Sequence, residues 1–177
     1  MQEDYSNRKN KQVEFLEKHL TRTIGFCQNC DTKSSIILAF IGVFIAGFIL
    51  DKDFRQVIFD NSGNCLFITL VISSLVILLY AIFFLLNSLK ARLDSSKYGV
   101  ETTSLLFFGN IAKSESFKEF AEKMKSLDDS KIEEDFLTEI YVNSKICDIK
   151  YRNFNKGLSL SLIGIAILLL SFLFFRL

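Results

Sequence analysis

The chain has no proline, no tryptophan and a single histidine, His19, among its 177 residues. Without proline, no residue of the kind that most strongly breaks a helix interior is present. With one histidine, neither a catalytic set of nucleophile, base and orienting group nor a zinc site of paired ligands follows from the spacing. The sequence also lacks a phosphate-binding glycine loop of the GxxxxGK[ST] or GxGxxG type. An enzyme is therefore the least favoured class.

Half of the residues are hydrophobic, and they gather in three runs without any charged residue, at 34–50, 66–86 and 158–175. As helices these runs would be about 25, 31 and 27 Å long, which suits a hydrocarbon core of roughly 30 Å. A core helix of a soluble protein needs only one apolar stripe, so the runs predict three transmembrane helices. Because they contain no Asp, Glu, Lys or Arg, a proton relay or a transporter pathway is not supported.

Basic residues orient the predicted helices, because Lys and Arg that flank a span are retained on the cytoplasmic side. Six of them precede residue 34, two lie in 51–64, twelve lie in 87–157 and one follows the third run. The N-terminus and residues 87–157 are therefore expected in the cytoplasm and the C-terminus outside. Residues 1–33 are charged and contain no apolar core, so no cleavable signal peptide is expected.

The predicted fold is an all-α membrane protein, with a small and mainly helical cytoplasmic domain inserted between the second and third transmembrane helices. The expected parts are a cytoplasmic amphipathic helix at 1–33, a span at 34–50, an external loop at 51–65, a span at 66–86, a cytoplasmic cap domain at 87–157, a span at 158–175 and an external tail at 176–177. Residues 87–157 have 12 basic and 12 acidic residues, so no nucleic-acid polymer is indicated as a partner.

Cys27 and Cys30 have the CxxC spacing of redox and metal sites. A zinc site needs a second pair of ligands, and the predicted topology places Cys65 and Cys147 on opposite sides of the bilayer. No βαβ pattern surrounds the pair, as a thioredoxin-like site would require. We expect no metal or resident cofactor and interpret the cysteines as structural thiols.

Local patterns predict the remaining elements. Apolar residues at three- and four-residue steps predict a helix at 8–26 with Asn7 as its N-cap. Because Gly25 is only a weak breaker, this helix is expected to run on into the first span with a kink. Residues 104–109 form a short apolar run that fits either a buried strand or an extended docking segment. No heptad array is expected.

Two capping boxes are predicted in the cap domain, Ser116 with Glu119 and Ser130 with Glu133. The second box precedes apolar residues that keep a helical period as far as the third span. One long helix is therefore expected from residue 130 through that span, with Gly157 as its weak point.

Asn29, Asp31 and Lys33 form a polar collar directly before the first span. In one interpretation Asp31 caps a helix and Lys33 extends to the membrane interface. In the other, Asp31 pairs with a base of the cap domain such as Arg92 or Lys113, because an unpaired charge near the bilayer is costly. Both interpretations stay open.

Three short motifs lie at the borders of these elements. They consist of Asp31, Lys33 and Ser34 before the first span, Phe107, Phe108, Gly109, Ile111 and Ala112 in the cap domain, and Lys150 and Tyr151 before the last span. Together they resemble the small transmembrane effectors of bacterial Pycsar antiphage defence. Ser34 stands where Ala is frequent in that family, and Ala91-Arg92 stands where Pro-Arg is expected.

The resemblance implies an effector of antiphage, abortive-infection immunity in the bacterial inner membrane. It implies a partner cyclase whose cyclic pyrimidine mononucleotide is sensed by the cap domain of a homo-oligomer, which then impairs the membrane. Such a ligand needs a base for its phosphate and an aromatic or amide group for its nucleobase. The candidates are Arg92 and Lys113 for the phosphate, and Asn110 and Phe108 for the nucleobase.

Two other classes stay open. A membrane-anchored interaction protein without a ligand explains the physical features equally well. A constitutive small channel subunit is the other class, and its pore would have to be lined by Ser, Thr and backbone groups.

Overall fold

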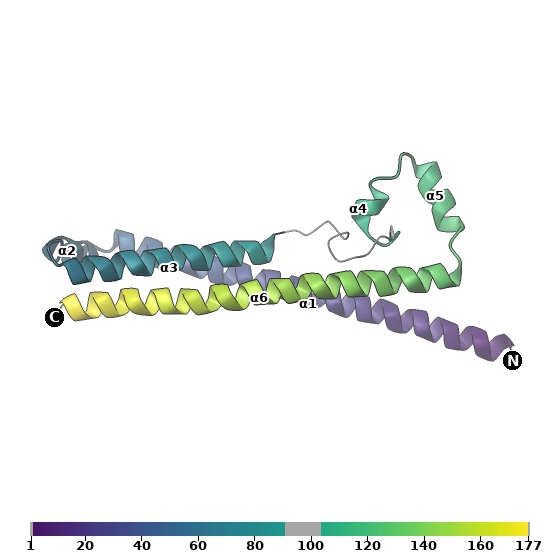
Figure 1. The fold of residues 1–177 in the computed structure, drawn as a ribbon, viewed down its shortest axis with the longest axis horizontal. Helices are drawn as coiled ribbons and strands as arrows, with labels where there is room; N and C mark the ends of the chain where they lie inside the picture. Colours follow the sequence, from purple (N-terminus) through teal and green to yellow (C-terminus); the bar gives the residue numbers. More distant parts are fainter. Residues whose placement is uncertain (1, 91–103, 177) are drawn as a thin grey trace. The chain divides into compact units, whose positions relative to one another are not determined.

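The computed structural model describes residues 2–90 and 104–176, with side chains from residue 9 onward. These residues form six helices and no strand, which confirms the all-α prediction (Figure 1). The helices are α1 (Gln2–Leu50), α2 (Lys52–Asp60), α3 (Cys65–Leu89), α4 (Phe108–Ile111), α5 (Phe117–Lys125) and α6 (Asp129–Arg176). Three of them, α1, α3 and α6, are long and apolar enough to cross a membrane, as predicted.

The chain divides into two compact units, and α1 and α6 contribute to both. We call Met1–Gln28 together with Ala91–Asp148 the cap unit. We call Asn29–Lys90 together with Ile149–Leu177 the span unit. Each unit is described separately below.

The starts of the two long helices differ from the prediction. Helix α1 already begins at Gln2, so Asn7 is an interior residue and not the N-cap, and the helix passes Gly25 without a break. Helix α6 is one continuous helix through Gly157, as expected, but the predicted box at Ser130 is wrong. The cap is Asp128, whose carboxylate accepts a hydrogen bond from the Lys131 amide at 2.8 Å. A carboxylate caps well because it also meets the positive end of the helix dipole.

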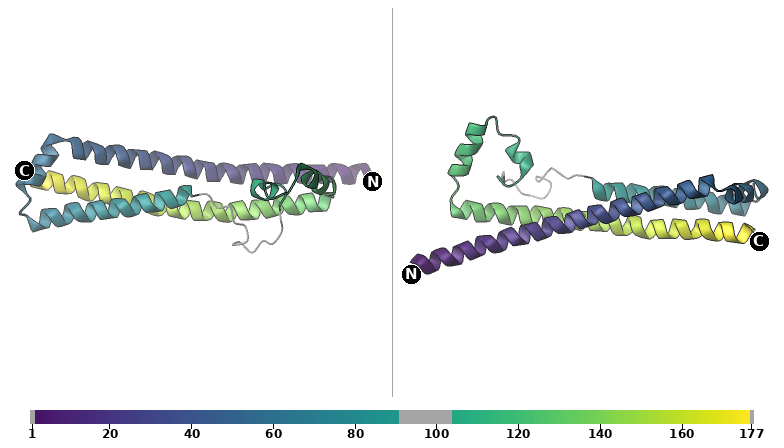
Figure 2. Two further views of the ribbon diagram at one scale, coloured as in Figure 1. Left: turned by 90° about the horizontal axis from the view of Figure 1, so that it is seen from above. Right: turned by 180° about the vertical axis from the view of Figure 1, so that it is seen from behind.

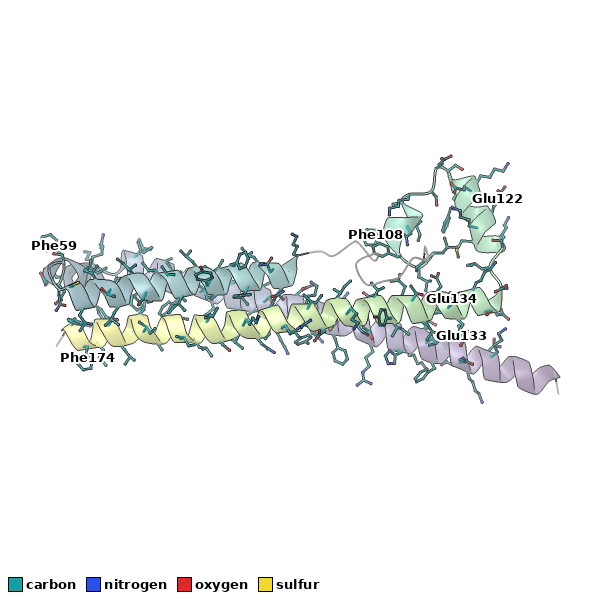
Figure 3. All side chains as sticks on the ribbon, viewed as in Figure 1. Phe59, Phe108, Glu122, Glu133, Glu134 and Phe174 are labelled. Atoms are coloured by element: carbon teal, nitrogen blue, oxygen red, sulfur yellow. The ribbon has the colours of Figure 1, made fainter. Side chains whose placement is uncertain are left out.

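In the cap unit, the N-terminal part of α1 is tied to the first turns of α6. Lys9 forms an ion pair with Asp129 at 2.9 Å, and Gln12 donates a hydrogen bond to Glu133, which is labelled in Figure 3. Further along, the Cys27 thiol lies 3.7 Å from the carbonyl oxygen of Asn143. The two helices are therefore held by polar contacts along their length.

Helix α5 starts at the predicted box. Ser116 caps it by accepting a hydrogen bond from the Glu119 amide at 3.2 Å. The Glu119 carboxylate reaches back to the amide of Glu115, at 2.8 Å, and not to that of Ser116. The serine cap is confirmed, and the acidic half of the box is displaced by one residue.

The segment before α4 is not a strand. Ser104–Phe107 has no regular secondary structure, and a single helical turn starts at Phe108. The Phe107 ring folds back over Gly109, where a Cβ would lie 2.5 Å from a ring carbon. The position therefore admits only glycine without moving Phe107.

In the span unit, α3 lies alongside the C-terminal half of α6, as Figures 1 and 2 show. Their buried positions alternate in steps of four and three residues. From Ser74 onward on α3 these are Ser74, Leu78, Ala81, Leu85 and Ser88, and from Lys150 onward on α6 they are Lys150, Phe154, Gly157, Ser161, Gly164, Leu168 and Ser171. This is a heptad seam, so the expectation of no heptad array is wrong.

The seam brings the two backbones close together, because glycines of α6 face leucines of α3. A Cβ on Gly157 would lie 2.7 Å from Cγ of Leu85, and one on Gly164 would lie 2.8 Å from Cγ of Leu78. The Ser74 hydroxyl donates to the carbonyl oxygen of Gly164 at 3.0 Å. Small and hydroxyl residues at helix contacts are typical of packing inside membranes, where close van der Waals contact replaces the hydrophobic drive.

The loop predicted at 51–65 contains a helix, α2. Its Asp51 cap accepts from the Phe54 amide at 2.8 Å, and Phe54 is buried. The turn residues after α2 have capping roles: Asn61 donates to the carbonyl oxygen of Phe175 at 3.3 Å, and Asn64 caps α3. The connection between the first two spans is therefore packed against the end of α6.

Candidate functional site

A buried polar cluster joins three helices of the span unit. It consists of Cys30, Asp31, Ser34, Ser88 and Lys150. The Lys150 ammonium donates to Asp31 at 2.5 Å and to the carbonyl oxygen of Ser88 at 3.0 Å. The Ser88 hydroxyl lies 3.0 Å from the Ser34 hydroxyl and 3.5 Å from the Cys30 sulfur. Helices α1, α3 and α6 thus meet in one hydrogen-bonded network.

Local sequence explains why these side chains meet. Cys30 and Ser34 are four residues apart and therefore share one face of α1. Ser88 lies in the last turn of α3, where backbone carbonyls have no partner within the helix. Lys150 supplies that partner, and its charge also meets the negative end of the α3 dipole.

The charges of the cluster balance. The Lys150 side chain is only 7% exposed, whereas Asp31 is 39% exposed. A lysine this deeply buried is tolerated only with a partner, because desolvation of an unpaired ammonium costs several kcal/mol by general estimates, of order 20 in the idealised limit. We therefore expect the pair to select one arrangement of the three helices more than to add net stability.

The predicted collar is only partly present in this cluster. Asp31 belongs to it, while Asn29 and Lys33 are exposed residues of α1. The base that pairs with Asp31 is Lys150, a residue of the predicted cap segment 87–157 that was not named as its partner. Three residues from two separate motifs of the resemblance, Asp31, Ser34 and Lys150, lie together here.

A second polar feature lies in the cap unit, around α4 and α5. A pocket of about 110 Å³ is lined by Leu105, Asn110, Lys113, Ser114 and Lys123. Two lysines, an amide and a hydroxyl give it the donors that an anion requires. Its volume is below the roughly 300 Å³ at which pockets for small organic ligands begin, so it suits a phosphate group and not a whole nucleotide.

Only two of the four predicted ligand residues line this pocket in the part of the chain that the structure describes. Asn110 and Lys113 line the pocket, and Asn110 is anchored by donating to the carbonyl oxygen of Ser104 at 3.1 Å. Phe108 does not line it. Its ring is 64% exposed at the start of α4, where Figure 3 labels it. Arg92 lies outside the described residues.

An acidic pair on α6 holds the segment that leads into α4. The Asp135 carboxylate accepts from the Leu105 amide at 2.9 Å. Glu139 is buried, and burial raises the pKa of its carboxyl above the ordinary value, with a smaller contribution from the charge of Asp135. Hydrogen bonds from Ser104 and Asn143 act in the opposite direction on that pKa. The segment before α4 is therefore held to α6 by two carboxyl groups, Asp135 at Leu105 and Glu139 at Ser104, and burial disfavours the charged form of Glu139.

Sequence reasoning missed Lys123, Ser88 and Glu139. Lys123 forms an exposed pair with Glu119 at 2.5 Å, a spacing that indicates only a surface helix. Ser88 could have been found by extending the four-and-three spacing from the central Ser74 of the second span. Glu139 carries no distinctive signal, because acids recur throughout residues 128–139.

The fold defines a class: a small, all-α, multi-pass membrane protein. Among the residues that the structure describes, no group of three or more His, Cys, Asp and Glu side chains could hold a metal ion.

Comparison with known proteins makes the assignment more specific. The family model of the Pycsar effector protein domain matches residues 15–176, and the chain belongs to this family. The Pycsar effector protein GmPycTM of Gulbenkiania mobilis is 28% identical over 163 residues, covering 79% of this chain and 81% of that protein. No solved structure matches. The chain is thus a membrane effector of the Pycsar antiphage system, and its family is not a class of enzymes.

Proposed function

We propose that the chain senses a cyclic pyrimidine mononucleotide with its cap unit and responds by impairing the inner membrane, acting as a homo-oligomer. The observation that carries the sensing role is the small pocket in which Asn110, Lys113 and Lys123 meet. Family membership supports the membrane role. The ligand would come from a partner cyclase.

The pocket would hold the phosphate of the ligand. Lys113 would supply a positive charge for the phosphate, and Lys123, which is paired with Glu119, would supply a second charged donor. Charge-assisted hydrogen bonds of this kind are the strong ones. The nucleobase would extend out of the pocket, because the cavity is too small for it. The exposed ring of Phe108 and the amide of Asn110 are the groups available to contact it. Arg92 remains a further candidate for the phosphate.

Coupling to the membrane would proceed through α1 and α6, which contribute to both units. A ligand shifts a two-state equilibrium only by its difference in affinity for the two states, and a change from 1:99 to 99:1 takes about 5.5 kcal/mol. The polar cluster lies at the first residues of both helices within the span unit. We propose that its rearrangement accompanies activation. The counts of flanking basic residues support a cytoplasmic N-terminus and cap unit.

Ligand binding is tested by calorimetry on the full chain in nanodiscs, titrated with cyclic CMP and cyclic UMP. Replacing Lys113 and Lys123 together by Ala is expected to weaken binding at least about tenfold, because both charge-assisted contacts are lost. Lys118→Ala is the matched control, since Lys118 lies on the same helix α5 and does not line the pocket. If no cyclic mononucleotide binds, or if the control weakens binding equally, the proposed site is wrong.

The membrane role is tested by dye release from proteoliposomes. Release that requires the nucleotide supports the effector. Release without a nucleotide would favour a constitutive channel subunit, and no release under either condition would favour a membrane-anchored interaction protein.

A further inference from the structure

A groove lies in the span unit at the end that contains α2, away from the polar cluster. It is bounded by the last turns of α1, by α2 and by the C-terminal end of α6, and has a volume of about 330 Å³. This volume falls within the range of roughly 300 to 1,000 Å³ that is typical of sites for organic ligands. Neither the sensing role nor the polar cluster involves this groove.

Aromatic rings form the walls of the groove. Phe48 packs against Phe44 and Phe54 with ring centroids 4.6 and 4.7 Å apart, and Phe54 lies 5.5 Å from Phe172. These contacts fix the rings against one another, so the walls are already in place without an occupant.

Gly47 opens the groove on the α1 side. A Cβ placed on Gly47 would have no other atom within 4 Å, so the space beside its backbone is open. Gly47 belongs to a helix that is long and apolar enough to cross a membrane, so in a bilayer this opening would face the acyl chains. The aromatic side of the groove, next to Gly47, thus offers an apolar surface to the acyl chains of a lipid.

Charged groups form the rim. Asp51, Asp53 and Arg176 line the same groove, and Arg176 forms an ion pair with Asp53 at 2.8 Å. Two acids and one base leave the rim with a net negative charge. The Asp53 and Arg176 side chains are 64% and 55% exposed, so both remain accessible to a headgroup.

We infer that the groove binds a phospholipid with a zwitterionic, amine-containing headgroup. One acyl chain would lie along the aromatic walls past Gly47. The ammonium of the headgroup would meet Asp51 and Asp53, and its phosphate would meet Arg176. An anionic headgroup without an amine would face the excess negative charge of the rim and bind less well.

A lipid fits this groove better than a second copy of the chain. The groove combines apolar aromatic walls with charged residues, as a phospholipid combines an apolar tail with a charged headgroup. Phe59 and Phe174, at 77% and 79% exposure, lie at the same end of the unit in Figure 3, and aromatic residues are enriched where a protein meets the membrane interface.

The experiment uses the full chain in nanodiscs that contain equal amounts of phosphatidylethanolamine and phosphatidylglycerol. Native mass spectrometry after release into detergent reports which lipid remains bound. We expect phosphatidylethanolamine to be retained in preference to phosphatidylglycerol. Gly47→Leu should lower the retained amount about tenfold, because the new side chain occupies the groove.

Gly42→Leu is the matched control. Gly42 lies on the same helix, its Cβ position is equally open, and it does not line the groove. Helical content and elution volume show that both variants fold. Asp53→Asn should reduce the preference between the two lipids without removing binding, because the rim then has no net charge.

The inference is overturned if the retained lipids mirror the bulk composition, or if the two glycine variants lose lipid equally. A change of oligomeric state in Gly47→Leu without any loss of lipid would assign the groove to a second copy. Each of these results is independent of nucleotide sensing.

Discussion

Helix α6 contributes to both units, and different kinds of contact hold it in each. In the span unit it presents Gly157 and Gly164 to leucines of α3, with backbones in close contact. In the cap unit it is held by polar side chains, several of them exposed, and Phe117 on the neighbouring α5 is 83% exposed. Close packing permits few alternative arrangements, whereas exposed polar contacts and uncovered rings permit many. The span unit is therefore expected to be the stiffer part and the cap unit the adaptable one.

The largest effect is expected from overpacking the seam. Gly157→Leu places a side chain where even a Cβ would lie 3.1 Å from the carbonyl oxygen of Ala81, so the helices must separate. We expect a loss of about 3 kcal/mol in the free energy of unfolding. Helicity followed by circular dichroism during titration with denaturing detergent measures it. Gly42→Leu, where the space is open, should change little, and equal losses in both variants would show that the seam is not tightly packed.

Breaking the polar cluster should have the next largest effect. Lys150→Met leaves the Asp31 carboxylate and the Ser88 carbonyl without their donor, at a cost of about 2 kcal/mol. The value is below that of a fully buried pair because Asp31 is 39% exposed. Asp31→Asn and the double variant complete a cycle measured by the same titration. Strictly additive losses would contradict direct pairing.

A smaller effect is expected in the cap unit from the start of α5. Ser116→Ala removes the hydroxyl that accepts from the Glu119 amide, at a cost of about 1 kcal/mol. Because the cap unit is the adaptable part, faster hydrogen exchange should be confined to α5. Ser116→Asp, which restores an acceptor, should return exchange to the original rate. Faster exchange that spreads into α3 would contradict the separation of the two units.

The smallest effect is a pH dependence at Glu139. Because burial raises the pKa of this carboxyl in the folded state, its contribution to stability is fully present below the ordinary pKa and falls as pH rises through the raised pKa. Glu139→Gln cannot ionise and avoids that loss. The difference in Tm between the variant and the original chain should therefore increase with pH across this window and then level off. A difference independent of pH would show that ionisation of Glu139 does not matter.

The fold was largely predictable because hydropathy acts on whole segments. Three apolar runs, an absence of proline and the Ser116 cap fix the helices without reference to tertiary contacts. The contacts themselves were less accessible. In a run where nearly every residue is apolar, an apolar heptad does not stand out. The seam is marked instead by small residues such as Gly157 and Ser74.

The candidate site was only partly predictable. A partner for Asp31 could be expected, because a charge beside the bilayer needs one, but periodicity within α1 says nothing about which base of another helix comes near it. Lys123 joins Lys113 in a pocket only after the chain folds back between α4 and α5. Such contacts join residues that are far apart in the sequence, and local sequence patterns do not predict them.

The heptad seam also has a consequence for sliding. Leu85 faces Gly157 and Leu78 faces Gly164, so moving α6 by seven residues, about 10.5 Å, would bring Leu85 to Gly164 with similar small-against-large contacts. The seam therefore sets how close α3 and α6 lie but leaves their register degenerate. Hydrogen bonds select one register: Ser74 on the Gly164 carbonyl within the seam, Lys150 on the Ser88 carbonyl at one end, and Asn61, just before α3, on the Phe175 carbonyl at the other. Without these contacts, α3 and α6 could pack equally well in more than one register.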